Sequence, residues 1–446
     1  MRKRFRWPFL ESGIEADIPL AILLVPLWWI LGITNVVFHA LSVFLLVKLL
    51  VLKSKTRSSL AVPGYLFFLL LFITTLILAL VFNLQGIPTM RLIAAVYNLS
   101  FWIMAATLFV VIHNTVRRSS LPSLMRAFVA FGMMNGVLSL GGTLLWLAGT
   151  REVVIPSLLG LVVNINRLPT NMPLIQYIFS LRITATGWVF LKDVPRSFGF
   201  SPYPTALALT MMLSVGMTLG YYHLTKKKSA LAALLVELVP LALTFSRTAV
   251  LGLIIGGLVV YTLLNFRRLR FATRALLIAI ALIAVGLSVP ARKLAEPIDK
   301  FRAESTSFRI NLYEKTLEEA VKKPVLGYGF KPLEEDATFP IASHSSFVGI
   351  IYRSGFLGFG LLVFFFAAVL VRWWRQKAAV MNDRILQTFW FWSGVCILGG
   401  LVWMLTEDLD APALAAFLFF TIIGYACGLK RAAASAPQPP ASPNRL

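Results

Sequence analysis

Charged side chains are scarce in this chain of 446 residues. Only 14% of the residues are charged, whereas 58% are hydrophobic and the mean hydropathy is +0.80. A soluble domain has about 25% charged and about 45–50% apolar residues. The composition therefore excludes an ordinary soluble globular protein, a disordered chain and a collagen-like fibre. It indicates an integral membrane protein.

Cysteine and acidic residues are also few. The two cysteines, Cys396 and Cys427, both lie within apolar runs, so they provide neither a disulfide framework nor a metal-binding set. We do not interpret any of the 19 acidic residues as a set of metal ligands. Glycine-rich loops of the Walker and dinucleotide-binding types are absent as well. We therefore expect no cofactor and no metal ion.

Basic residues are plentiful and give a net charge of +23. They occur in short clusters between apolar runs, which is the pattern of membrane topology and not of nucleic-acid binding. At roughly 20 apolar residues per crossing, the sequence predicts about twelve spans. The predicted spans are residues 15–33, 34–52, 60–84, 92–113, 122–149, 202–224, 229–245, 248–265, 274–290, 346–371, 386–405 and 411–429. Every basic cluster precedes the first span or follows an even-numbered span, which predicts that both termini are cytoplasmic.

This assignment predicts an all-α polytopic membrane protein with two long periplasmic loops that contain interfacial helices. In the second loop, apolar residues recur with helical spacing over residues 308–323. The first loop has apolar stretches at 158–163 and 172–179, which we expect to lie in the membrane interface. The predicted segments are spans one to five (1–149), the first loop (150–201), spans six to nine (202–290), the second loop (291–345), the last three spans (346–429) and a disordered cytoplasmic tail (430–446).

His344 is the strongest candidate for chemistry among the four histidines. It lies in a polar stretch, Ser343 to Ser346, where the chain enters the tenth predicted span. An imidazole at that place titrates near neutral pH and is suited to take a proton from a hydroxyl. The alternative is a turn that caps the helix, with His344 as a bystander. For His39, His113 and His223, packing or interfacial roles are the better interpretation.

The residues after His344 extend this pattern. His344 and Ser345 are followed by nine residues and then by Gly355 and Gly358, which gives the motif H-S-x9-G-x-x-G. The motif resembles that of the O-antigen ligase family, whose relatives include Wzy-type O-antigen polymerases and bacterial O-oligosaccharyltransferases. Members of this family have about twelve spans, and the motif follows their large late periplasmic loop.

Three arginines strengthen the resemblance. Arg247 belongs to a Ser-Arg pair between the seventh and eighth predicted spans, and Arg196 opens an Arg-x-x-Gly stretch before the sixth. Arg309 precedes a Pro-x-x-Gly-x-Gly turn that begins at Pro324. The family has similar arginines at these places. Guanidinium groups bind two phosphate oxygens at once, so Arg196, Arg247 and Arg309 suit a pyrophosphate-linked donor. The alternative for each is an interfacial arginine that binds lipid phosphate or reaches towards the headgroups.

Other residues are candidates for supporting roles. They are Ser345, Arg353, Arg182, Glu237 and Asp408. Glu237 lies within a predicted span and needs a partner or a cavity there. Asp408 lies with Glu407 and Asp410 at the outer mouth between the last two spans, where an acid would orient His344 or an acceptor sugar. A solvated loop is the alternative for these acids, and we expect Glu334, Glu335 and Asp336 to be solvated.

The resemblance implies a glycosyltransferase of the bacterial inner membrane with its site facing the periplasm. Its donor would be a glycan on undecaprenyl diphosphate, and its acceptor a hydroxyl of lipid A-core. His344 would act as general base, direct attack would invert the anomeric carbon, and neither ATP nor a metal would be needed. The partners are then the donor, the acceptor and membrane lipids, without nucleic acid. The alternatives are a polysaccharide polymerase, a protein O-oligosaccharyltransferase and, from another class, a transporter of lipid-linked glycans.

Overall fold

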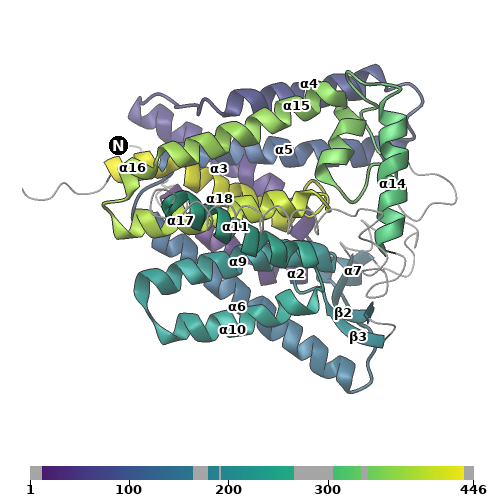
Figure 1. The fold of residues 1–446 in the computed structure, drawn as a ribbon, viewed down its shortest axis with the longest axis horizontal. Coiled ribbons are helices and arrows are strands. Elements are labelled where there is room, and N and C mark those ends of the chain that lie inside the picture. The colour runs from purple at the N-terminus through teal and green to yellow at the C-terminus, as the bar shows by residue number, and fades with distance from the viewer. Residues whose placement is uncertain (1–12, 164–178, 190–191, 266–304, 333–339, 436–446) are drawn as a thin grey trace, which may run out of the picture.

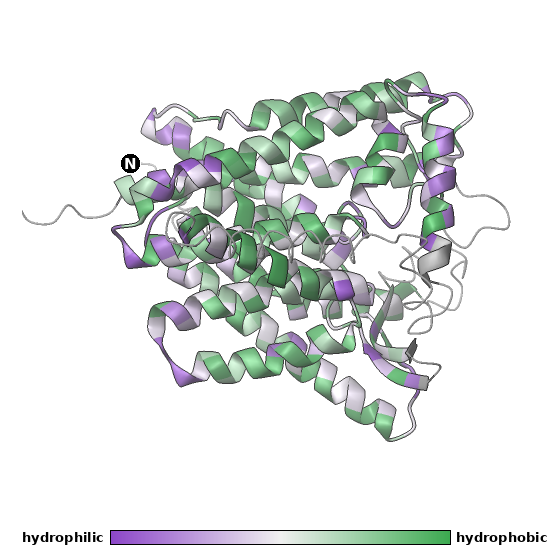
Figure 2. Cartoon of the chain, in the orientation of Figure 1, coloured by the Kyte–Doolittle hydropathy of each residue, from purple (hydrophilic) through white to green (hydrophobic). Residues whose placement is uncertain are grey.

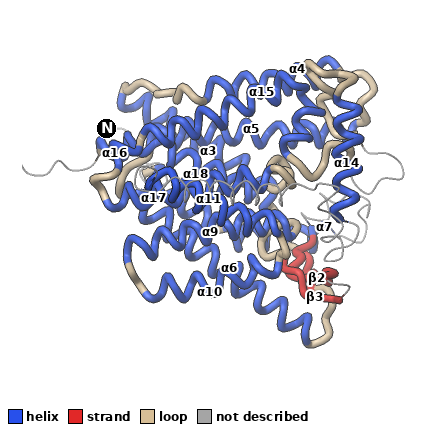
Figure 3. Tube along the Cα trace, in the orientation of Figure 1, coloured by secondary structure: helices blue, strands red, loops and turns tan. Residues whose placement is uncertain are grey.

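The computed structural model describes residues 13–163, 179–189, 192–265, 305–332 and 340–435 (Figure 1). Long helices dominate these residues, and most of them run side by side along one direction (Figure 3). In the described part of the chain, eight helices are long and apolar enough to cross a membrane. They are α3 (Thr34–Thr56), α5 (Thr89–Thr115), α6 (Ser120–Leu147), α9 (Pro204–Thr225), α11 (Arg247–Asn265), α15 (Ser346–Arg375), α17 (Arg384–Met404) and α18 (Ala413–Ala434).

Three further predicted spans coincide with shorter or broken helices. Helices α1 (Ile14–Leu23) and α2 (Val25–Leu31) meet at an angle of 57° and together would make a ninth span. Pro26 at the start of α2 explains the break, because it has no N–H to continue the hydrogen bonds of α1 and its ring crowds the preceding turn. Helices α4 (Leu66–Phe82) and α10 (Lys228–Leu243) are apolar but shorter. The predicted span 274–290 lies outside the described residues, and the count of twelve stays a prediction.

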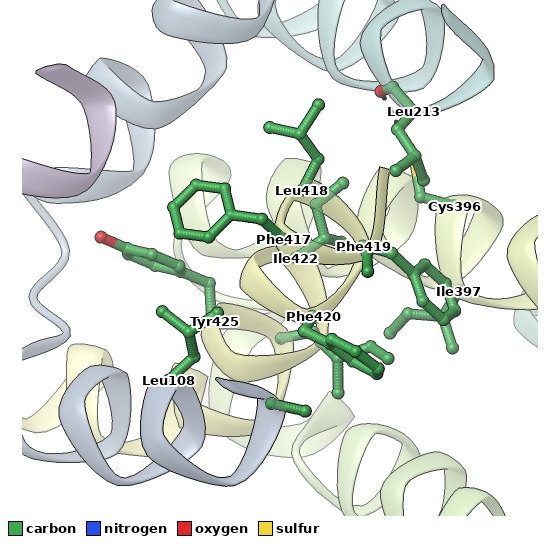
Figure 4. Close-up of a cluster of buried hydrophobic side chains, with 14 of the residues drawn as sticks. Leu108, Leu213, Cys396, Ile397, Phe417, Leu418, Phe419, Phe420, Ile422 and Tyr425 are labelled. Carbon is green, nitrogen blue, oxygen red and sulfur yellow. Dashed lines mark hydrogen bonds between the residues drawn. The ribbon is translucent and has the colours of Figure 1, made fainter. Parts of the chain in front are cut away.

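Helix α18 forms the centre of the bundle. It packs against α5, α17, α3 and α9, and nearly all of its residues are buried. Figure 4 shows the aromatic side chains of Phe417, Phe419, Phe420 and Tyr425 surrounding this helix, with Leu108 of α5 beside them. Such a fully apolar helix needs partners on every side, which a multi-helix bundle provides.

The outer helices expose apolar side chains instead. Phe67 and Phe82 of α4 and Leu144 of α6 are 60%, 72% and 66% exposed. Figure 2 shows hydrophobic residues along the whole length of these helices, with hydrophilic residues concentrated at their ends. Apolar surface on this scale is unfavourable in water and is expected where helices contact lipid. The described chain is therefore a multi-pass membrane protein.

The first predicted loop contains a small sheet that the all-α prediction missed. Strands β1 (Val153–Pro156), β2 (Ser180–Val189) and β3 (Lys192–Ser197) form an antiparallel sheet in the order β1-β2-β3. Only the short helix α7 (Leu158–Val163) agrees with the interfacial helices expected there. The second predicted stretch, 172–179, lies almost entirely outside the described residues. The fold is thus nearly all-α, with one sheet beside the ends of the helices.

The two ends of the bundle differ in character. Helix α14 (Ser305–Ala320) lies across one end of the long helices, on the side of the sheet (Figure 1). It confirms the helix predicted at 308–323. We call this end the α14 end. Several basic residues between the predicted spans meet at the opposite end, where Arg117 pairs with Glu15, Arg118 pairs with Asp383, and Arg431 donates to the His113 carbonyl. We call that end the basic end.

Helix α15 carries the two motif glycines and has a break at one of them. Gly355 adopts φ +64° and ψ −174° in the middle of the helix. A Cβ atom at Gly355 would collide with the backbone carbonyls of Val325 and Pro324. Only glycine tolerates both this conformation and this close approach. The break therefore explains why glycine is required at this motif position.

Candidate functional site at the α14 end

Four segments that lie far apart in the sequence meet at the α14 end. They are α14, the turn at 324–331, the stretch 340–346 before α15, and the loop 405–412 between α17 and α18. The turn docks on the broken part of α15, where the Tyr328 and Gly329 N–H groups donate to the carbonyls of Tyr352 and Arg353 at 2.9 and 2.8 Å. The Pro-x-x-Gly-x-Gly turn and the H-S-x9-G-x-x-G motif therefore form one structural unit.

His344 lies at the centre of this unit in a rare backbone conformation. Its φ is +64°, and that of nearby Ala342 is +67°. The Tyr313 hydroxyl of α14 donates to the His344 carbonyl, and the Ala342 N–H donates to Thr316 Oγ1 at 3.1 Å. Left-handed backbone is costly for residues with a side chain and tends to occur at functional sites, where surrounding contacts enforce it. These contacts therefore fix the His344 backbone, and the role of its side chain stays a prediction.

Asp408 joins three of the four segments. Its Oδ2 atom accepts from the His344 N–H at 3.2 Å and pairs with Lys331 Nζ at 2.8 Å. Its Oδ1 atom is buried, and no group among the described residues donates a hydrogen bond to it. A buried carboxylate oxygen without a donor is costly, so this atom is a candidate to accept a hydrogen bond from a group that the described residues do not supply.

Arg309 is paired with the neighbouring acid. Its Nη2 atom contacts Glu407 Oε1 at 2.8 Å, and Nη1 donates to the Thr406 carbonyl at 3.3 Å. Glu407 is buried, and its second oxygen accepts from Thr205 Oγ1 at 3.0 Å. The Arg309 guanidinium is thereby fixed in orientation, although part of it is already occupied by protein groups.

Arg353 of α15 and Asp410 of the loop 405–412 form a buried ion pair. Their side chains are only 3% and 2% exposed. Burial alone would raise the pKa of the Asp410 carboxyl, but the charges of Arg353 and Lys331 lower it below its ordinary value. Asn98 of α5 donates to the Asp410 carbonyl at 2.6 Å. Arg353 thus anchors the acidic loop to α15, which is a structural task.

The imidazole of His344 has a pKa below its ordinary value. Burial is the largest cause, and Arg309 and Lys331 lower the pKa further, whereas Glu407 and Asp408 oppose the shift. The side chain is therefore neutral at pH 7 and able to accept a proton. The two acids beside it would stabilise the imidazolium ion that results.

Arg196 and Arg247 form a second group near α10 and α11. Arg196 of β3 donates from Nε to the Thr244 carbonyl at 3.3 Å, three residues before Arg247 begins α11. Gly252 packs on Gly399 and Gly256 on Val395, so α11 and α17 run antiparallel. This register places Arg247 level with Met404, at the α14 end.

The remaining candidates lie elsewhere or have structural partners. Arg182 pairs with Glu152 at 2.8 Å on the exposed face of the sheet. Glu237 is buried within the bundle and accepts from Thr218 Oγ1 at 2.8 Å instead of meeting an arginine. Ser345 caps α15 by accepting from the Val348 N–H at 3.3 Å. His39 packs against Tyr97 and Phe101.

Two further histidines and three acids complete this comparison. The carbonyls of His113 and His223 accept hydrogen bonds from Arg431 and Arg384 at 2.6 and 3.2 Å. Both residues therefore lie at the basic end, away from the α14 end. Glu334, Glu335 and Asp336 are outside the described residues.

Two site residues were missed by the sequence analysis. Lys331 and Tyr313 contact Asp408 and His344, but neither belongs to a recognisable local motif. Tyr313 was noted only as part of the apolar stripe of α14. The position of Lys331, two residues after Gly329, was the one available signal for it.

Fold and site together define a multi-pass α-helical membrane protein with a layer of paired charges around a histidine at one end. Residues 230–363 match the family model Wzy_C, described as O-antigen ligase. This match confirms the resemblance to the O-antigen ligase family over these residues. The matched segment includes Arg247, Arg309 and His344, whereas Arg196 lies before it. No curated protein matches the chain.

Proposed function

We propose that this protein transfers a glycan from undecaprenyl diphosphate to a hydroxyl of lipid A-core at the periplasmic face of the inner membrane. The observation that carries the proposal is the placement of His344. It is held in left-handed backbone beside Asp408 and Arg309, inside the segment that matches the O-antigen ligase family. A neutral imidazole next to acids and guanidinium groups suits an acceptor hydroxyl and a pyrophosphate leaving group.

The reaction requires one bond to form and one to break. His344 takes the proton from the acceptor hydroxyl, and the oxygen attacks the anomeric carbon of the donor sugar. The bond between that carbon and the diphosphate oxygen breaks, so undecaprenyl diphosphate leaves and the anomeric configuration inverts. Glu407 and Asp408 stabilise the protonated imidazole.

The arginines have the complementary task of holding negative charge. In this proposal the donor diphosphate is held by Arg196 of β3, Arg247 at the start of α11 and Arg309 of α14. Guanidinium groups are permanently charged and bind phosphate oxygens in pairs. They would stabilise the diphosphate as its bond to the sugar breaks, without a metal ion.

The orientation in the membrane is part of the proposal. The basic residues at the opposite end of the bundle support a cytoplasmic location for that end. Cys396 and Cys427 are buried and should not react with a thiol reagent. Labelling would therefore report the accessibility of the added cysteine alone. Val321→Cys, at the exposed residue directly after α14, should react with an impermeant thiol reagent in intact spheroplasts, whereas Lys227→Cys should not. Reversed labelling would contradict a periplasmic site.

The acceptor is tested by reconstitution. Purified protein is given the lipid-linked donor with lipid A-core, with a second lipid-linked glycan, or with a protein rich in serine and threonine. We expect transfer to lipid A-core. Exclusive transfer to the second glycan would identify a polymerase, and exclusive transfer to protein an O-oligosaccharyltransferase.

A further inference from the structure

A second cavity lies at the basic end, far from His344. It has a volume of about 360 Å³ and lies between the first turn of α1, the last turns of α3 and α5, and the end of α18. Asn98 of α5 contacts the loop at the α14 end, whereas Asn114 of the same helix lines this cavity. At about 1.5 Å per residue the two positions are roughly 24 Å apart, so the cavity is separate from the candidate site.

Positive charge predominates in the lining of this cavity. Lys53, Arg117 and Arg431 contribute three cations, and Glu15 is the acid among the lining residues. Glu15 is already paired with Arg117 at 2.8 Å. Arg431 donates from Nη1 to the His113 carbonyl, and no carboxylate of the described residues contacts Lys53 or Arg431. Among the described residues, the cavity therefore retains a net positive charge that no carboxylate neutralises.

Part of the remaining lining is apolar, and Thr56, Ser58, Asn114, Thr115 and Ser435 add polar groups. Ile14 and Leu49 are buried side chains of α1 and α3, and Leu52 lies one turn further along α3. The cavity opens where these helices end, which is the depth of lipid headgroups around a membrane-spanning bundle. A ligand with a phosphate group next to a hydrocarbon chain matches both kinds of wall, whereas a free anion would leave the apolar wall without a partner.

We propose that this cavity binds the phosphate group of an anionic membrane phospholipid, with Lys53 and Arg431 as its principal cationic contacts. The lipid fills the space between α1, α3 and α18 and ties the ends of these helices together. This site is independent of glycan transfer at the α14 end, and neither proposal depends on the other.

The test measures lipid binding to the purified protein by native mass spectrometry. Phosphatidylglycerol and phosphatidylcholine are titrated separately, and sodium phosphate is titrated as a third ligand. We expect the wild type to bind phosphatidylglycerol more tightly than phosphatidylcholine. At about 1 kcal/mol per basic residue, the double variant Lys53→Gln and Arg431→Gln should weaken phosphatidylglycerol binding roughly 25-fold.

A matched control removes the same charge outside the cavity. Lys55→Gln with Arg375→Gln alters two exposed residues of α3 and α15 at the basic end, and binding should change less than about twofold. The single variants, each expected to weaken binding roughly fivefold, replace the double variant if it does not fold. Equal losses in the cavity and control variants, or equal affinity for the two lipids, would overturn the proposal. Binding of phosphate from sodium phosphate as tight as that of phosphatidylglycerol would assign the cavity to a soluble anion and overturn the lipid assignment.

Discussion

The backbone N–H of His344 donates to Asp408 Oδ2 at 3.2 Å, across a separation of 64 residues in the sequence. Lys331 Nζ contacts the same oxygen at 2.8 Å. One carboxylate thus fixes the stretch before α15 against the loop before α18. Because the contact is to the backbone of His344, it holds the residue in place through a group other than the imidazole.

The left-handed backbone of His344 predicts that two variants, His344→Gly and His344→Ala, differ in stability but lose activity equally. Glycine adopts φ +64° without cost, so His344→Gly should be about 1 kcal/mol more stable than His344→Ala. Both variants lack the base and should lose about 10²- to 10⁴-fold in transfer rate. Thermal unfolding and initial rates of the two purified variants check this. A rate above about a tenth of wild type in either variant would exclude His344 as the base.

The charges around His344 predict shifts of the acid limb of the pH profile. His344 is active when neutral, and its pKa is lowered, so kcat/KM should fall only below about pH 6.5. Lys331→Gln removes a charge that lowers this pKa, so the limb should move to higher pH. Glu407→Gln removes a charge that raises it, so the limb should move to lower pH. If the acid limbs of the two variants moved in the same direction, a group other than His344 would be the one that titrates.

Arg247 is expected to act through the shape of its guanidinium group as well as its charge. Lysine keeps the charge but cannot hold two phosphate oxygens in one plane. Arg247→Lys should therefore impair transfer nearly as much as Arg247→Ala. Full activity of the lysine variant would indicate an interfacial cation without a role in donor binding.

Two glycines of α15 give a matched pair for the break in that helix. Gly355→Ala introduces both a collision with the carbonyls of residues 324 and 325 and an unfavourable φ, and should lower stability by roughly 2–5 kcal/mol. Gly360 has open space at the Cβ position, so Gly360→Ala should keep or slightly raise stability. Thermal unfolding in detergent measures both. Equal effects would show that the turn at 324–331 does not depend on the break.

The sequence predicted the long helices because each contains an apolar run of membrane-spanning length. It also predicted α14 to within three residues from its apolar stripe. The sheet was missed because β2 lies between stretches that read as an interfacial loop, and one of its two pairings, β1 with β2, joins segments as far apart in sequence as Pro156 and Ser180. For a short strand, such pairing outweighs any local signal.

The candidate site divides in the same way. His344 and Arg309 were predicted as candidates because each belongs to a short motif at a turn or a helix start, and such a motif can be read from neighbouring residues alone. The partners of Arg353 and Arg182 were not predicted, since Asp410 and Glu152 are brought to them by tertiary packing. Lys331 escaped notice because it contacts Asp408 only after the turn docks on α15.

The most direct test of the account uses detergent-solubilised protein with donor and lipid A-core, in excess EDTA and without nucleotide or membrane potential. The donor's own phosphoester bond supplies the driving force, and permanently charged arginines stabilise the leaving diphosphate. The account predicts transfer by the wild type under these conditions and loss of transfer in His344→Ala. Activity that disappears in EDTA and returns with Mg²⁺ or Mn²⁺, or that requires a sealed and energised vesicle, would contradict it.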